Sequence, residues 1–124
     1  KVLQGSGEEK LVLRRDVFQS CLVLYPESVW NEQMDSLRAR LNRWDNKQQQ
    51  VYRQFVSEAE LVQLDGNGRF LISRRCMKAV EMEADVRFVG MGDTIEIWSV
   101  KKADEALMDE KTFGEELQRL LNEE

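Results

Sequence analysis

The sequence has the length and composition of an ordinary globular protein. Its 124 residues are 42% hydrophobic and 33% charged, enough for one compact domain or two small interdependent halves. It contains no histidine, which removes the commonest general base and metal ligand and argues against an enzyme. The net charge of −5 argues weakly against nucleic acid as a partner, but residues 99–124 carry eight acidic and only four basic side chains. Residues 1–98 are therefore nearly neutral, and a local basic patch there can still bind DNA.

Membrane insertion and disulfide bonding are not expected. No apolar run approaches the roughly 20 residues of a membrane-spanning helix, and no signal-peptide pattern opens the chain. Cys21 and Cys76 lack a CxxC partner and lie in apolar or helical contexts, which predicts two buried thiols in a reducing cytosol rather than a disulfide. Because the first residue is Lys1, we expect the chain to be processed or to lack its true start.

The first part of the chain predicts a strand pair followed by a helix. Residues 1–7 have the pattern of a helix end and a glycine-serine turn, and residues 11–13 and 21–25 predict strands, the second stopped by Pro26. A helical stripe follows, which we interpret as core, with a partner surface as the alternative. Its members are Trp30, Met34, Leu37, Leu41 and Trp44.

A second helix is predicted directly after this stripe. Asp45 and Gln48 have the spacing of a capping box, in which the first residue caps the helix and the residue three positions on bonds back. The apolar face of this helix would include Val51, Phe55 and Val56. The two helices would then form a helical hairpin between two β-rich parts.

The segment Asp65-Gly66-Asn67-Gly68 predicts a tight turn between strands at 60–64 and 69–72. Gly66 and Gly68 accept positive φ, and Asp65 is expected to form the turn by accepting hydrogen bonds from backbone amides. The same letters resemble the start of a calcium loop, but position twelve would be Cys76, which cannot replace the bidentate glutamate. No metal or cofactor is expected.

The remaining sequence predicts a short basic helix near 74–80, a second strand pair and a terminal helix. The strands are expected at 86–89 and 94–98, turned at Gly92-Asp93. The terminal helix is expected to start near Thr112 in a capping box. Its apolar stripe comprises Phe113, Leu117, Leu120 and Leu121.

The order of elements occurs twice. Residues 1–3 precede two strands and a helix, and residues 78–80 precede two more strands and a helix, with an aromatic residue closing each second strand. We interpret this order as a two-fold internal repeat. The second copy is preceded by the hairpin at 65–72, so the first copy should have a matching hairpin upstream of Lys1.

Three segments together resemble the MraZ family, a branch of the AbrB-like swapped-hairpin DNA binders. They are residues 21–26 with Trp30, the run from Asp65 to Ile72, and residues 89–93 continuing into Glu96-Ile97-Trp98. The segments cover nearly the whole chain in the order of the family. The sequence departs from the family pattern in two places. Ser73 stands where the family often has proline, which could make entry to the short helix looser. The first Asp-x-x-Gly-Arg hairpin of the family is absent from this sequence.

The resemblance implies an α+β fold with two pseudo-repeated swapped-hairpin β units joined by a helical hairpin and followed by a C-terminal helix. The expected boundaries are 1–44 for the incomplete first unit with its helix, 45–59 for the connecting helix, 60–110 for the second unit and 111–124 for the last helix. The family consists of cytoplasmic regulators that form rings and bind tandem repeats upstream of the division and cell-wall operon.

The candidate DNA-binding residues are Arg69, Arg74, Arg75 and Lys78. Arg69 would stand at the tip of a β-hairpin, where arginine can bond guanine or hold a phosphate, with a solvated charge as the alternative. The other three would hold backbone phosphates, unless they form a solvated helix face or pair with Glu81 and Glu83.

We therefore expect a non-enzymatic, sequence-specific DNA-binding transcriptional regulator. Its partners would be double-stranded promoter DNA and further copies of itself in a ring, in a cytoplasmic, nucleoid-associated protein without membrane contact. An antitoxin-like relative of the same fold, which binds a toxin and its own promoter, is the alternative. A small enzyme is a third class, and the sequence contains no paired nucleophile and base to support it.

Overall fold

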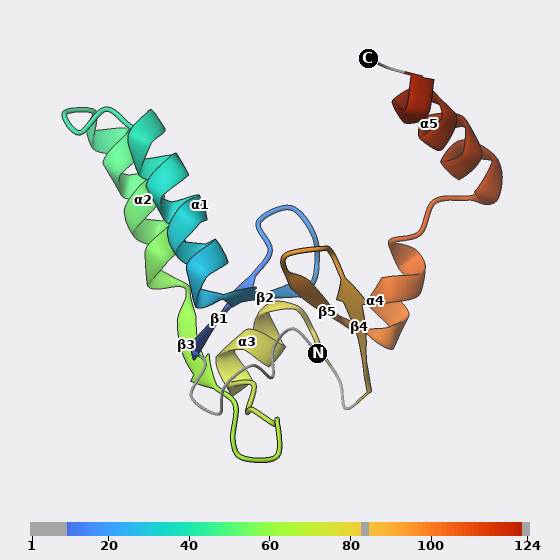
Figure 1. Ribbon diagram of the computed structural model, residues 1–124, viewed down its shortest axis with the longest axis horizontal. Coiled ribbons are helices and arrows are strands. Elements are labelled where there is room, and N and C mark those ends of the chain that lie inside the picture. Colours follow the sequence, from blue (N-terminus) through green and yellow to red (C-terminus); the bar gives the residue numbers. More distant parts are fainter. Residues whose placement is uncertain (1–9, 83–84, 123–124) are drawn as a thin grey trace.

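The computed structural model describes residues 10–82 and 85–122 and has the predicted α+β fold, with one five-stranded antiparallel sheet. The predicted helix end at 1–7 and the prediction for Glu83 lie outside the described residues. The strand order in the sheet is β3-β1-β2-β5-β4 (Figure 1). The elements are β1 (Lys10–Arg15), β2 (Leu22–Pro26), α1 (Glu27–Arg40), α2 (Asn46–Ser57), β3 (Glu60–Gln63), α3 (Arg74–Ala79), β4 (Val86–Gly90), β5 (Ile95–Ser99), α4 (Val100–Glu105) and α5 (Glu110–Asn122).

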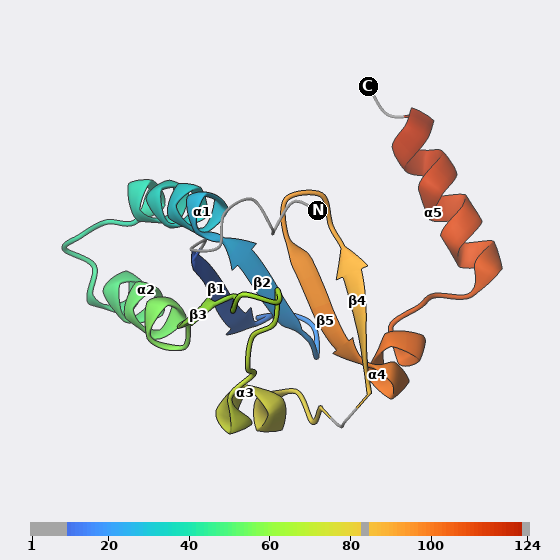
Figure 2. The same cartoon turned by 60° about the horizontal axis from the view of Figure 1, so that its bottom comes forward.

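Strands β1 and β2 are buried on both faces, which explains why they are continuous apolar runs rather than alternating ones. Successive side chains point to opposite faces of a strand, so each strand contributes to two clusters. On one face, Leu13 and Leu24 pack with Cys76 of α3. On the other, Val12 and Tyr25 pack near α1 and α4. Helices α1 and α3 thus lie on opposite sides of the sheet (Figure 2).

The repeated order of elements is visible in the sheet. Hairpin β1–β2 leads directly into α1, and hairpin β4–β5 leads directly into α4. The second strands of the two hairpins pair with each other, with Val23 opposite Glu96 at the centre of their register. Tyr25 and Trp98 occupy corresponding positions at the ends of these strands, and both are buried. The two hairpins therefore form one continuous sheet with an approximate two-fold arrangement.

The edges of the sheet differ. Strand β3, which follows the helical hairpin, pairs with β1 and covers that side of the first hairpin. On the opposite side β4 is the outermost strand of the sheet formed by the described residues. Phe88 of β4 is 56% exposed, whereas Leu13 of β1 is fully buried. Equivalent strands thus have different burial because only one has a further neighbour.

The helical hairpin is present, and the prediction for its apolar stripe is partly wrong. Helix α1 ends at Arg40 and Leu41 is extended, so Trp44 lies in the connection and is 88% exposed rather than in the core. Met34 is buried, as predicted. Asp45 caps α2 by accepting from the Gln48 amide at 3.1 Å. The reciprocal bond of a capping box does not form, because the Gln48 side chain accepts from Asn42 instead.

Helix α2 is joined to the sheet through a buried arginine. Arg14 Nε donates to the Phe55 carbonyl at 3.0 Å, and its guanidinium pairs with Glu58 at 3.0 Å. The guanidinium also lies 4.0 Å from the centroid of the Phe55 ring. Burial lowers the pKa of Arg14, and the Glu58 carboxylate opposes that shift. The predicted burial of Val51 and Val56 is wrong, because both stay exposed on α2.

Two further predictions need correction, and one helix was not predicted. Residues 69–72 do not form a strand, because they pair with no neighbour in the described sheet. Helix α5 begins at Glu110, because Asp109 rather than Thr112 is the cap and accepts from the Thr112 amide at 3.0 Å. Helix α4 was not anticipated, and Ser99 caps it by accepting from the Lys102 amide.

Candidate nucleic-acid interface

The loop at residues 65–69 is ordered by the side chain of its first residue. Asp65 Oδ1 accepts from the amides of Asn67 at 2.8 Å and Arg69 at 2.9 Å. The Asp65 amide also donates to the Arg69 carbonyl at 2.7 Å, which closes the loop. Gly68 has a φ of +77°, a conformation that side chains rarely adopt. The loop therefore has a defined shape, and it projects from the sheet beyond α3 (Figure 1).

Arg69 stands on this loop with its side chain 74% exposed. Its nearest charged partner is Asp65, with Nε 3.8 Å from Oδ2. A long ion pair between two exposed groups contributes little to stability, so the guanidinium can leave it for a stronger partner. Arg69 is thus an available planar donor on an ordered tip, suited to a phosphate or to the edge of a guanine.

Arg75 is in a different situation, because it pairs with Glu60 of β3. Its Nη2 lies 2.7 Å from Glu60 Oε2, and the same oxygen accepts from Ser73 Oγ at 2.9 Å. Burial raises the pKa of Glu60, but the hydrogen bonds from Ser73 and Arg75 outweigh it, so the pKa is lowered from its ordinary value. The expected alternative partner Glu81 instead pairs with Lys102. Arg75 therefore anchors α3 to the sheet.

Ser73 holds the start of α3 in place. It accepts from the Cys76 amide at 3.2 Å while donating to Glu60. The expectation that serine at this position loosens entry to the helix is therefore wrong. A serine cap and its bond to Glu60 take the place of the conformational restriction that proline would supply.

Arg74 and Lys78 are exposed and lie four residues apart on α3, on neighbouring turns of one face. Within residues 10–82 and 85–122, the structure records no ion pair for either side chain. Arg75, which lies between them in the sequence, differs because it pairs with Glu60. Of the four predicted basic residues, three are thus available to a polyanion, and one is engaged in the fold.

An apolar groove lies beside Arg69. Its volume is about 640 Å³, and it extends between the 64–72 segment and the turn that joins β4 to β5. Phe70, Phe88 and Ile95 contribute to its walls, and its charged lining residues are Arg69 and Asp93. The groove therefore offers apolar contact area next to a cation, without a convergent set of polar groups.

Neither a cluster of metal-binding side chains nor a membrane-spanning helix occurs among the residues that the structure describes. No group of three metal-binding side chains comes together there. The Asp65 carboxylate, considered above for calcium, is occupied by backbone amides. None of the described helices is long and apolar enough to cross a membrane.

The sequence-based interpretation missed Glu60, the carboxylate that pairs with Arg75 and so makes Arg75 less available to DNA than Arg69. A signal was present, because residues two apart share a face of a strand. Glu60 is therefore on the same side of β3 as Val62, which packs against the cluster that contains Cys76 of α3. That alternation would have directed Glu60 toward the short basic helix.

Comparison with known proteins identifies relatives over the whole chain. Residues 55–119 match the model of the MraZ protein family, which is described as antitoxin-like. The chain is 53% identical over 121 residues to the transcriptional regulator MraZ of Phocaeicola vulgatus, covering 98% of this chain and 79% of that protein. It is 49% identical to the protein of that name in Bacteroides fragilis, over 98% of this chain and 77% of the relative. For Bacteroides thetaiotaomicron the identity is 48%, over 100% of this chain and 80% of the relative.

Proposed function

This chain belongs to the MraZ family, and we propose that it is a transcriptional regulator that binds duplex DNA through the loop at residues 65–69. The observation that supports the proposal best is the exposed guanidinium of Arg69 on a loop ordered by Asp65. The names of the relatives support the regulatory role. The regulator is cytoplasmic and associated with the nucleoid.

The loop and helix α3 have separate tasks in this proposal. Arg69 enters the major groove, where arginine donates two parallel hydrogen bonds to guanine. Arg74 and Lys78 contact backbone phosphates, which supplies affinity without sequence reading. Arg75 remains paired with Glu60 and keeps α3 at a fixed distance from the loop. The fold thus fixes the position of the base-reading loop relative to the phosphate-binding helix α3.

Several copies act together on one promoter. Identical subunits joined head to tail form a ring when the rotation between them closes. A ring presents its loops in the same direction around the assembly, which suits tandem direct repeats better than a palindrome. The target, by resemblance to the family, is the set of repeats upstream of the division and cell-wall operon.

The test is a titration of intact protein and Arg69→Ala protein against tandem-repeat and scrambled duplexes at several salt concentrations. Loss of a bidentate arginine is expected to weaken binding to the repeats by about 1–3 kcal/mol per contact. Avidity makes the total loss larger. Arg87→Ala is the matched control, since Arg87 is also exposed and paired with an aspartate, Asp104.

The substitutions separate base reading from phosphate binding. If Arg69 reads a base, Arg69→Lys should keep binding to scrambled DNA but lose discrimination in favour of the repeats. Lys78→Ala should weaken binding to all duplexes alike and reduce the salt slope by about one unit per contact. Unchanged affinity of Arg69→Ala for both duplexes, with the oligomer intact, would remove the loop from the DNA-binding surface.

The antitoxin-like description of the family supports a second candidate function, in which the helical parts bind a toxin. Co-expression with the product of an adjacent gene should then give a stable complex that survives Arg69→Ala. Failure to form such a complex would leave DNA binding as the function of the chain.

A further inference from the structure

Helix α5 has an apolar face without a partner in the described structure. Its exposed stripe consists of Phe113, Leu117, Leu120 and Leu121, and none of its residues is buried. The helix lies apart from the sheet, beyond α4, in both ribbon views (Figures 1 and 2). A stripe of large apolar side chains on an exposed helix marks a surface that another element covers.

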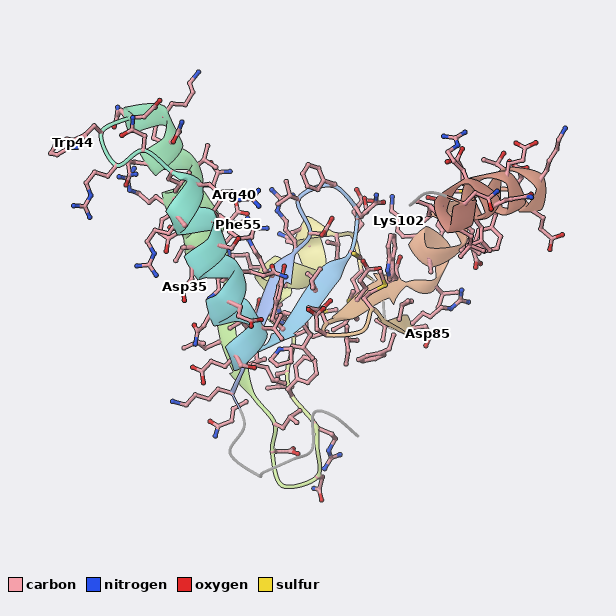
Figure 3. The ribbon with its side chains drawn as sticks, turned by 45° about the horizontal axis from the view of Figure 1, so that its top comes forward. Asp35, Arg40, Trp44, Phe55, Asp85 and Lys102 are labelled. Carbon is pink, nitrogen blue, oxygen red and sulfur yellow. The ribbon has the colours of Figure 1, made fainter. Side chains whose placement is uncertain are left out.

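A groove lined mainly by apolar side chains, which could receive the apolar stripe of α5, lies at the other end of the molecule. It runs between the β1–β2 loop and the helical hairpin α1–α2, with a volume of about 470 Å³. Figure 3 shows Arg40 and Phe55 on the side of the helical hairpin that faces this loop. The apolar lining residues are Val17, Phe18, Met34, Leu37, Val51 and Phe55.

The β1–β2 loop, which forms one wall of this groove, carries a solvent-exposed phenylalanine, Phe18. Phe18 is 88% exposed, yet its amide and that of Gln19 donate to Asp16 Oδ2 at 2.9 and 2.8 Å. The Asp16 amide in turn donates to the Cys21 carbonyl at 2.8 Å. The backbone is therefore ordered, while the large side chain has no cover. An ordered, exposed aromatic residue is typical of an anchor at a protein interface.

The outer end of the helical hairpin and α5 have net charges of opposite sign. Residues 37–54, at the outer end of the helical hairpin, carry five basic side chains and one acidic one, while residues 27–36 add three acidic side chains to α1. Residues 109–122, which contain α5, carry four acidic and two basic side chains. Arg40 lines the groove itself. Opposite charges around an apolar centre favour association and fix its direction.

The geometry favours a second copy over the same chain as the source of the helix. The helical hairpin and α5 lie on opposite sides of the sheet assembly in both ribbon views (Figures 1 and 2). Only residues 106–109 separate α4 from α5, and α4 is fixed to the sheet through buried Ala103. A linker of four residues spans at most about 14 Å, which keeps the start of α5 beside α4, on the far side of the sheet from the groove of its own chain.

We propose that α5 of one copy docks into the groove between the β1–β2 loop and the α1–α2 hairpin of the next copy. The stripe of α5, with spacings of four, three and one, supplies the anchors of a helix-in-groove interface. The two surfaces are different, so the contact is head to tail and repeats around a ring. This inference rests on the proposed ring, and it names the surfaces that build it.

Disulfide trapping tests the contact directly. Leu117→Cys protein and Leu37→Cys protein are mixed, allowed to exchange subunits and oxidised with diamide. The native thiols are buried and form little background. We expect a covalent dimer that contains one chain of each variant. Gln118→Cys, on the polar face of α5, is the matched control and should give much less of it.

A second measurement does not depend on cross-linking. Leu117→Glu/Leu121→Glu should shift sedimentation from the oligomer to the monomer, whereas Gln118→Glu should not. The variant should keep the circular dichroism spectrum of a folded chain, since α5 buries no residue of its own chain, and its melting temperature should fall only by the stabilisation that the oligomer supplies. An intact oligomer that gives no Leu37–Leu117 product places the interface elsewhere and overturns this inference, while the proposed ring stands. A protein that sediments as a monomer overturns both, and the Arg69 titration then tests DNA binding separately.

Discussion

The two β-hairpins of the molecule have the same order of elements and very different burial. Hairpin β1–β2 lies in the middle of the sheet, between β3 and β5, and is covered on both faces. Hairpin β4–β5 contributes one buried strand, β5, and one partly exposed edge strand, β4. The difference arises because β3, which follows the helical hairpin, pairs with the first unit. The same order of elements thus occurs twice, and the chain that surrounds each hairpin determines its burial.

The largest effects are expected where the two hairpins are alike. Trp98→Ala should reduce the free energy of unfolding by about 3–5 kcal/mol, because it removes a large buried side chain. Tyr25→Ala, at the corresponding position, should have a similar cost. Urea unfolding followed by circular dichroism measures both. Trp44→Ala is the control, and this exposed residue should change stability by less than about 0.5 kcal/mol.

A contrast is expected where the hairpins differ. Leu13→Ala should cost about 2–5 kcal/mol, since Leu13 is fully buried. Phe88→Ala, at the corresponding position of β4, should cost less than about 1 kcal/mol in the isolated chain. The same unfolding experiment compares them. An equal cost for both would show that β4 is covered by another element in solution.

A smaller effect concerns the contact of β3 with α3. Because the pKa of Glu60 is lowered in the folded protein, its contribution to stability is present above the ordinary glutamate pKa of about 4.3. The contribution is lost as the pH falls through the lowered value. Glu60→Gln should therefore reduce the slope of stability against pH on the acid side, by less than about 1 kcal/mol in total. Melting temperatures between about pH 3 and 7 provide the measurement, and identical profiles for both proteins would contradict it.

The smallest expected effect is that the two cysteine thiols of the folded protein are not alkylated. Burial, with Glu96 and Asp16 nearby, raises the pKa of Cys21 to about 12, so its thiolate is scarce at neutral pH. Burial also raises the pKa of Cys76. We expect neither thiol to react with iodoacetamide within the time that alkylates the unfolded chain. Rapid labelling of Cys21 in the native protein, detected by mass spectrometry, would show that the centre of the first hairpin opens.

The sequence predicted the strands well, because apolar runs bounded by glycine or proline depend on local chemistry. The runs at Leu11 and at Cys21 before Pro26 are examples. It failed where the outcome depends on the rest of the fold. Trp44 keeps helical spacing although the helix has already ended at Arg40. Residues 69–72 keep strand alternation, with Phe70 inward and Leu71 outward, but no neighbouring strand pairs with them.

In the candidate site, too, the features set by local chemistry could be predicted and those that depend on the rest of the fold could not. The loop at residues 65–69 could be foreseen, since Asp65 and Gly68 specify its backbone; the positive φ expected for Gly66 is not observed. The distinction between Arg69 and Arg75 could not, because it depends on Glu60, fifteen residues before Arg75. Basic residues that look alike in the sequence therefore separate into an available cation and an engaged one only when β3 is placed against α3.

The hydrogen bonds of Asp65 have a consequence for how this protein can evolve. Asp65 Oδ1 holds the loop by accepting from the backbone amides of Asn67 and Arg69, and neither bond uses the side chain at position 69. Substitutions at that position other than proline therefore keep both bonds and the loop shape. A lineage can exchange the arginine for another residue, acquire a different DNA preference and keep a folded protein at every step. Change at Asp65 has no such freedom, so selection on the loop should act on its shape at position 65 and on its target at position 69.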